Sequence, residues 1–276
     1  MRTVRLIVAY DGTEFSGFQR QRGVRTVQEE LEIAASRMAC ERVIIRGAGR
    51  TDAGVHARCQ VAAFRTEADI SDRGWRLGMT GMLPRSIVVT DARYVQDNFD
   101  PRTASSGKRY RYSLLVGPDR DPLLRHCLWH IYDGFDVDRM EREAASFVGT
   151  HDFAAFRAAD CERKTTVRTV FRVAVTRTAE RPDIVHIDVE GTAFLKNMVR
   201  VMAGTLVDVG RGKLEPGVVA ARIADRDRTR SGMTAPPHGL SLEQVYLREA
   251  WRVPDDPRPL VPPYAAPFLE PPVEAP

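Results

Sequence analysis

The chain opens with a regular alternation of apolar and other side chains. Apolar residues occupy every second position from Val4 to Tyr10, and an Asp-Gly pair then gives a turn signal. This period is typical of a half-buried β-strand. A helix is predicted next, because Thr26 and Glu29 form a capping box and apolar residues then recur at helical spacing. The sequence therefore begins with a strand followed by a helix.

The same patterns predict a repeated order of elements. In the first half they give strands at 42–46, 60–65 and 86–95 and a helix from Ser71 to about residue 82. In the second half they give strands at 108–116, 168–177, 183–191 and 242–247, helices at 137–148 and 196–209, and a short helix starting at Pro216. Each half reads βαββαβ. The predicted fold is α+β, with two tandem ferredoxin-like domains at 1–105 and 106–250 and a Pro-rich tail at 251–276.

Composition excludes several classes of protein. At 276 residues, 43% hydrophobic and 28% charged, the chain is neither fibrous nor disordered. It has no apolar run of membrane-spanning length and its start turns polar too soon for a signal peptide, so we expect a cytoplasmic protein. The four cysteines lack metal-ligand spacing, which predicts reduced thiols and no metal site. A net charge of +4 is mildly basic and favours polyanions without proving one.

One stretch, "RGAGRTDAGVHARCQ" at residues 46–60, contains almost nothing that could fill a core. Its glycines permit a tight turn and close ligand approach, which places Asp52 on an accessible loop between two strands. Asp52 can act there as a nucleophile or base, or can simply bond its own backbone as an Asx-turn residue. A phosphate cradle fits poorly, because neither GxxxxGK[ST] nor GxGxxG is present in the stretch. The loop alone leaves the first two readings open.

The segment "GRTDAGVHA" at residues 49–57 resembles the active-site signature of the TruA family of tRNA pseudouridine synthases. Thr80 stands where the family usually carries Asn, and Ser86 where an Asp is common. The resemblance extends in the family's order through "YDGTEFSGFQRQ" (10–21), "TVQEELE" (26–32), "KRYRY" (108–112), "HDFAAFR" (151–157), "FLKNMVRVMAGTLVDVG" (194–210) and "APPHGLSLEQVYL" (235–247).

The resemblance implies a role for each matching residue. Asp52 is expected to be the nucleophile, in a central cleft between the two domains. Arg50 is expected to enter the space left by a flipped nucleotide, and Arg200 to form an ion pair with Asp52. Tyr110 is expected to pack against the target base, and Leu240 to line the uracil pocket. Without the family, Tyr110 and Leu240 would be assigned to the core and Arg200 to a snorkelling side chain.

The resemblance also implies a substrate. It predicts isomerisation of uridine at positions 38 to 40 of the anticodon arm of tRNA, by a homodimer and without a cofactor. Basic clusters that include Lys108, Arg22 and Arg168 are expected to follow the RNA backbone, although such clusters are usually solvated faces. His56 can be a general acid, but the chemistry needs no histidine, so we expect a structural role. The rival class is an RNA-binding module of the same fold without catalytic activity.

Overall fold

The computed structural model describes residues 1–251 except 133, 135 and 162. The Pro-rich tail therefore lies outside the described residues apart from Trp251. The chain forms two compact units. Unit 1 combines residues 1–106 with the segment that begins at Ser241, and unit 2 comprises residues 107–240. Within the described part of the chain, no helix is long and apolar enough to cross a membrane.

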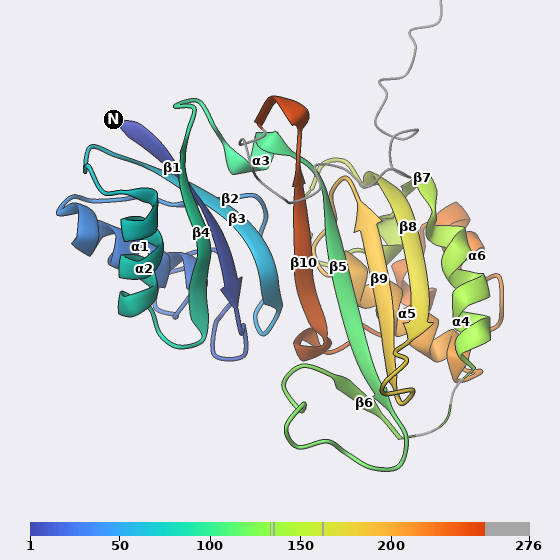
Figure 1. The fold of residues 1–276 in the computed structure, drawn as a ribbon. Coiled ribbons are helices and arrows are strands. Elements are labelled where there is room, and N and C mark those ends of the chain that lie inside the picture. Colours follow the sequence, from blue (N-terminus) through green and yellow to red (C-terminus); the bar gives the residue numbers. More distant parts are fainter. Residues whose placement is uncertain (133, 135, 162, 252–276) are drawn as a thin grey trace, which may run out of the picture. The chain divides into compact units, whose positions relative to one another are not determined.

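Unit 1 contains a mostly antiparallel sheet with two helices on one face (Figure 1). Its strands lie in the order β4-β1-β3-β10, and β2 pairs with β3. The elements of the unit are β1 (Arg2–Tyr10), α1 (Val27–Ala39), β2 (Arg46–Gly47), β3 (His56–Thr66), α2 (Asp72–Met82), β4 (Ile87–Val95), α3 (Pro101–Ala104) and β10 (Leu240–Leu247).

The first strand is more buried than its alternation predicts. β1 lies between β3 and β4, and its two faces are both covered. Arg5 is fully buried on the face expected to meet solvent, where its Nη2 donates to Asp91 Oδ2 at 2.9 Å. The prediction of a half-buried strand is therefore wrong in this respect. A charged side chain at a polar position becomes buried when a carboxylate on the neighbouring strand pairs with it.

The two helices of unit 1 begin at the predicted caps. Thr26 Oγ1 accepts a hydrogen bond from Glu29 N at 3.4 Å, and Ser71 Oγ accepts one from Gly74 N at 3.1 Å. The strand predicted at 42–46 is wrong, because β2 contains only Arg46 and Gly47. The residues around the predicted domain boundary at 105/106 form α3, which Asp100 caps through its side chain, and the start of β5.

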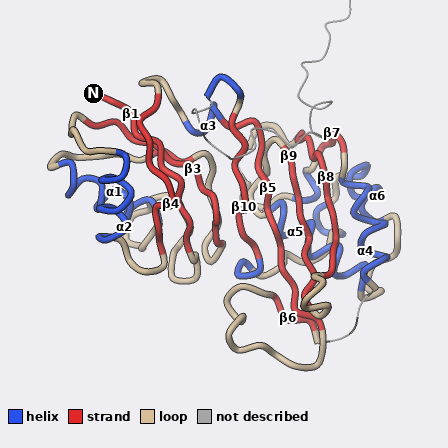
Figure 2. The backbone as a smooth tube through the Cα atoms, in the orientation of Figure 1, coloured by secondary structure: helices blue, strands red, loops and turns tan. Residues whose placement is uncertain are grey.

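Unit 2 is a second antiparallel sheet with helices packed on one side (Figure 2). Its strands lie in the order β5-β9-β8-β7, and β6 pairs with β5 in parallel. The elements are β5 (Ser105–Val116), β6 (Trp129–Ile131), α4 (Val137–Ala144), β7 (Gly149–Asp152), β8 (Val167–Arg177), β9 (Ile184–Gly191), α5 (Met198–Gly210) and α6 (Val218–Asp225). β6 and β7 were not predicted.

Helix α5 is buried nearly all round. The predicted core face is buried, and so is the rest of the helix from Val201 to Gly210. One cause is a loop that crosses it, because a Cβ on Gly204 would lie 1.8 Å from the carbonyl oxygen of Met233. Glycine is required where two backbone segments approach so closely.

The predicted mixed α+β class is confirmed, and the observed sheet is mostly antiparallel. The tandem ferredoxin-like arrangement stays a prediction. The final strand differs from the predicted domain limits, because Ser241 and Leu242 of β10 pair with His56 and Ala57 of β3 in unit 1.

Candidate active site

Asp52 lies at the start of a tight turn in the loop of residues 48–55, which joins β2 to β3. Val55 N donates to the carbonyl oxygen of Asp52 at 3.1 Å and closes the turn, with Gly54 at φ +76°. The Asp52 side chain is half-buried, whereas Arg50 on the same loop is exposed. The structure thus places the predicted nucleophile and the predicted base-flipping residue close together in the chain, on one accessible loop.

A second loop, residues 11–18, is hydrogen-bonded to the Asp52 loop. Phe18 N donates to the carbonyl oxygen of Thr51 at 3.1 Å, and Gly54 N donates to that of Phe15 at 3.3 Å. The hydroxyl groups of Tyr10 and Thr51 lie 2.8 Å apart in a buried environment. The backbone on both sides of Asp52 is therefore fixed by groups from the end of β1 and the loop that follows it.

His56 connects the same two loops. Its Nδ1 accepts a hydrogen bond from Gly12 N at 3.0 Å and lies 3.1 Å from Asp11 Oδ1. The hydrogen bond from Gly12 agrees with the structural role expected for His56, because it ties the start of β3 to the turn after β1.

In unit 2, Arg200 is fixed by neutral acceptors. Its Nε donates to the carbonyl oxygen of Ala235 at 2.8 Å, and its Nη1 donates to Asn197 Oδ1 at 2.9 Å. Asn197 precedes α5 with φ 61°, in the left-handed region. The guanidinium is thereby held at the first turn of α5. Asp52 and Arg200 belong to different units, and the ion pair between them stays a prediction.

Three aromatic and basic residues of β5 lie on one face of the strand. Lys108, Tyr110 and Tyr112 occupy alternate positions of β5, opposite Gly191, Val189 and Ile187 of β9, and all three are buried. Tyr110 is 7% exposed and meets the ring of Phe194 edge-on at 5.4 Å. The packing of Tyr110 is what a core residue would show, so its predicted contact with the target base stays a prediction.

The segment before β10 is organised by Arg200 and Tyr112 together. Tyr112 Oη donates to the carbonyl oxygen of Pro236 at 2.7 Å, one residue after the carbonyl that Arg200 binds. Burial raises the pKa of the Tyr112 hydroxyl, and the nearby Arg200 charge opposes that shift. Gly239 packs on the Tyr112 ring, and Leu240 follows it. The structure thus brings Arg200, Tyr112 and the backbone leading to Leu240 into one cluster within unit 2.

The two arginines predicted to bind RNA differ in solvent exposure and hydrogen bonding. Arg22 is exposed in the loop before α1. Arg168, at the start of β8, is half-buried, and its Nη1 donates to the carbonyl oxygens of Thr165 and Val167. Partial burial, and secondarily the charge of Arg163, lower the pKa of the Arg168 guanidinium. Arg22 is therefore better placed than Arg168 to contact a phosphate, and both roles stay predictions.

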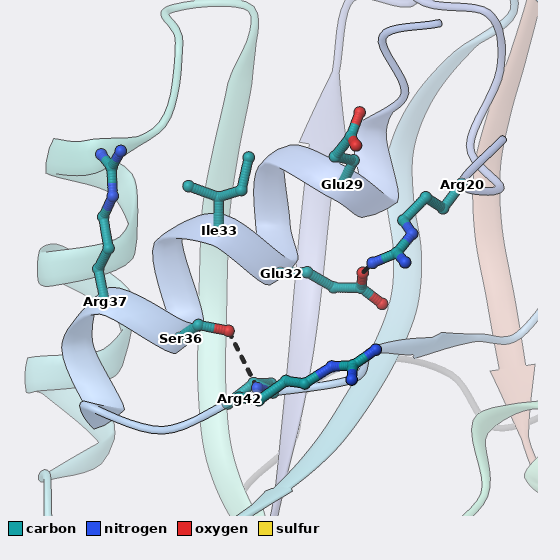
Figure 3. A pocket seen from close by; sticks show the side chains of 8 residues that line it. Arg20, Glu29, Glu32, Ile33, Ser36, Arg37 and Arg42 are labelled. Carbon is teal, nitrogen blue, oxygen red and sulfur yellow. Dashed lines mark hydrogen bonds and ion pairs between the residues drawn. The ribbon is translucent and has the colours of Figure 1, made fainter. Parts of the chain in front are cut away.

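A cavity of about 330 Å³ lies on the outer surface of α1 (Figure 3). Arg20 Nη1 donates there to Glu32 Oε2 at 2.9 Å, and Glu32 Oε1 accepts from Ile45 N at 3.0 Å. Asp52 is not among its lining residues. Two of the polar side chains drawn in Figure 3 join α1 to neighbouring loops, since Glu32 pairs with Arg20 and Ser36 Oγ accepts from Val43 N.

Sequence reasoning missed the residues that support the predicted site. Tyr10 was read as a strand residue, and Thr51 was not singled out within the signature. Asn197 was treated as part of a helix that in fact starts at Met198. The available signal was the Asn itself, since Asn tolerates left-handed backbone at a helix end better than most residues do.

Comparisons with known proteins identify the family of the chain. A family model described as tRNA pseudouridine synthase matches residues 6–102 and 144–246. The tRNA pseudouridine synthase A of Geotalea uraniireducens is 45% identical over 246 residues, which cover 89% of this chain and 100% of that protein. The protein of the same name from Geobacter sp. (strain M21) is 46% identical over 250 residues, covering 90% and 100%. That from Myxococcus xanthus is 45% identical over 249 residues, covering 90% and 93%. The chain belongs to the tRNA pseudouridine synthase family.

Proposed function

We propose that this chain isomerises uridine to pseudouridine in tRNA through a covalent bond from Asp52. Family membership supports the reaction and the substrate class. The observation that carries the role of Asp52 is its loop, which is accessible and yet fixed by hydrogen bonds on both sides. A nucleophile requires this combination of exposure and fixed geometry.

The reaction needs no change of redox state. The N1 to C1′ glycosidic bond breaks, the uracil turns, and C5 bonds to the same C1′. C5 loses a proton and N1 gains one, so uridine and pseudouridine have the same composition. An ionised Asp52 can attack either C1′ or C6 of the ring, and in either case it is regenerated when the product forms.

The target base must leave its stack before Asp52 can reach it, which costs a few kcal/mol. In the proposal the exposed Arg50 side chain fills the vacated space. Tyr110 packs on the flipped base, a contact worth about 1 to 3 kcal/mol. Leu240 lines the uracil pocket, and Arg200 pairs with Asp52 and holds it ionised.

The finer assignment follows the family resemblance. The proposal places the target at positions 38 to 40 in the anticodon arm, with Arg22, Lys108 and Arg168 on the RNA backbone. It includes a homodimer, and a cytoplasmic location because tRNA is the substrate.

Pseudouridine mapping on tRNA incubated with the purified protein tests the proposal. Wild-type protein should convert an anticodon-arm uridine, and Asp52→Asn should bind tRNA with unchanged affinity but lose turnover, because an amide is a poor nucleophile. The control is Asp69→Asn, which neutralises an exposed carboxylate paired with Arg2 in the same unit. If Asp52→Asn kept more than about a tenth of the rate, a barrier change of about 1.4 kcal/mol, Asp52 would not be the nucleophile. Tight tRNA binding without conversion by the wild type would favour an RNA-binding module instead.

A further inference from the structure

Tyr10 ends β1 directly before the 11–18 loop, and its side chain is only 4% exposed. Its ring lies 6.3 Å from that of Phe18, and its hydroxyl contacts Thr51 Oγ1 at 2.8 Å. A buried tyrosine needs a partner for its hydroxyl, and here the partner is the residue next to Asp52. The contact links the central strand of unit 1 to the proposed nucleophile by two side chains.

The Tyr10 hydroxyl stays protonated across the pH range of most assays. Burial raises the pKa of Tyr10 to about 12, and hydrogen bonds to Thr51 and Gln60 oppose part of that shift. Gln60 also donates from Nε2 to the carbonyl oxygen of Gly49 at 3.0 Å. Tyr10, Gln60 and Thr51 therefore connect both ends of the segment that carries Asp52.

Thr51 is held at two points. Its side chain meets Tyr10, and its carbonyl oxygen accepts from Phe18 N. Because Asp52 also accepts from Val55 N, the backbone on each side of the carboxylate is fixed. A loop rich in glycine would otherwise sample many conformations, which would spread the carboxylate over many positions.

We propose that Tyr10 is a positioning residue for Asp52, acting through the hydroxyl of Thr51. The inference rests on the proposed function, since it concerns the same nucleophile. It predicts an effect on the chemical step and none on tRNA affinity, because neither hydroxyl faces the solvent from which RNA binds.

The experiment measures single-turnover rates at saturating tRNA and tRNA Kd for wild type, Tyr10→Phe, Thr51→Val, Thr51→Ser and the double variant Tyr10→Phe/Thr51→Val. The first two substitutions should each lower the rate about tenfold or more, since small misplacements of reacting groups cost this much. Thr51→Ser keeps the hydroxyl and should retain most of the rate. The double variant should be no slower than the slower single variant, because each of its single variants already lacks the Tyr10–Thr51 contact.

Tyr94→Phe supplies a matched control in the same unit. The Tyr94 hydroxyl accepts from Trp75 Nε1 at 3.1 Å and donates to the carbonyl oxygen of Ile70 at 2.8 Å. Removing it should lower the free energy of unfolding and leave the rate unchanged. If Tyr10→Phe behaved like Tyr94→Phe, or if Thr51→Ser were as slow as Thr51→Val, the positioning role would be overturned. An inactive wild type would instead overturn the proposed function, and the positioning role with it.

Discussion

Two glycines allow the 11–18 loop to lie against the Asp52 loop. A Cβ on Gly12 would lie 2.0 Å from the carbonyl oxygen of Val55, and one on Gly17 would lie 2.6 Å from that of Thr51. Gly17 also has φ +90°, a conformation that other residues rarely adopt. At the scale of the residue, the geometry around Asp52 depends on the absence of side chains as well as on hydrogen bonds.

Gly17→Ala should therefore lower stability by roughly 1 to 3 kcal/mol, because the backbone is strained and the two loops are forced apart. It should also lower turnover. Gly81→Ala is the control, because that glycine lies in α2 with no atom near its Cβ position. Alanine there should stabilise the protein by about 0.5 to 1 kcal/mol. Denaturant unfolding of both variants checks the pair, and equal effects would contradict it.

Tyr10 also predicts how stability depends on alkaline pH. Its folded pKa of about 12 exceeds the unfolded value near 10, so between these values the folded state binds more protons. Its contribution is fully present below pH 10 and is lost as pH rises towards 12. By pH 11 this loss amounts to about 1.4 kcal/mol, and Tyr10→Phe should remove it. Unfolding free energies at pH 8, 10 and 11 measure it, and parallel curves for wild type and variant would refute it. Tyr112 acts in the same direction, so some alkaline loss should remain.

At the scale of the element, the helices were easier to predict than the strands. Capping residues act locally, and Thr26 and Ser71 mark the helix starts correctly. Residues 42–46 alternate like a strand, with Val43 and Ile45 buried and Ile44 exposed. Their backbone nevertheless bonds to side chains of α1, with Val43 N donating to Ser36 Oγ and Ile45 N to Glu32 Oε1. The sequence predicted which of these side chains are buried. It did not predict that their backbone groups bond to side chains of α1 instead of to another strand.

The candidate site shows the same limit. The signature at residues 49–57 is contiguous in the sequence, so it indicated Asp52 and Arg50 directly. The cluster of Arg200, Tyr112 and the carbonyls of Ala235 and Pro236 joins distant parts of the chain, and no local pattern reports such contacts.

The start of α5 provides a test at this scale. Asn197→Gly keeps the left-handed backbone and removes the acceptor for Arg200 Nη1, whereas Asn197→Ala also strains the backbone by about 1 kcal/mol. If the orientation of Arg200 matters to the reaction, both variants should lose turnover, and Asn197→Ala should also be less stable than Asn197→Gly. Turnover and denaturant unfolding measured together check this, and wild-type turnover in both would show that the Asn197 contact is dispensable.

At the scale of the whole molecule, the modest charge of +4 still permits strong RNA binding if basic residues cluster. The affinity for tRNA should fall steeply with salt, with a log-log slope of about −0.7 to −0.9 per phosphate neutralised. Arg22→Glu should reduce the slope, because Arg22 is exposed. The control is Arg181→Glu, since Arg181 already pairs with Asp121 and Asp183. Binding measured from 50 to 300 mM salt, about the range where such contacts weaken, checks this. Equal slopes for wild type and Arg22→Glu would exclude Arg22 from the interface.

The pairing of β10 with β3 affects how the chain acquires its structure during synthesis. A ribosome produces residues 1–106 long before Ser241, so the sheet of unit 1 lacks strand β10 until nearly all of unit 2 has been made. Until then the β3 edge beside His56 and Ala57 exposes unpaired backbone groups, which is a site for aggregation. Expressing residues 1–106 alone should therefore give a product that self-associates. Size-exclusion chromatography of this product checks the expectation, and a stable monomer would contradict it.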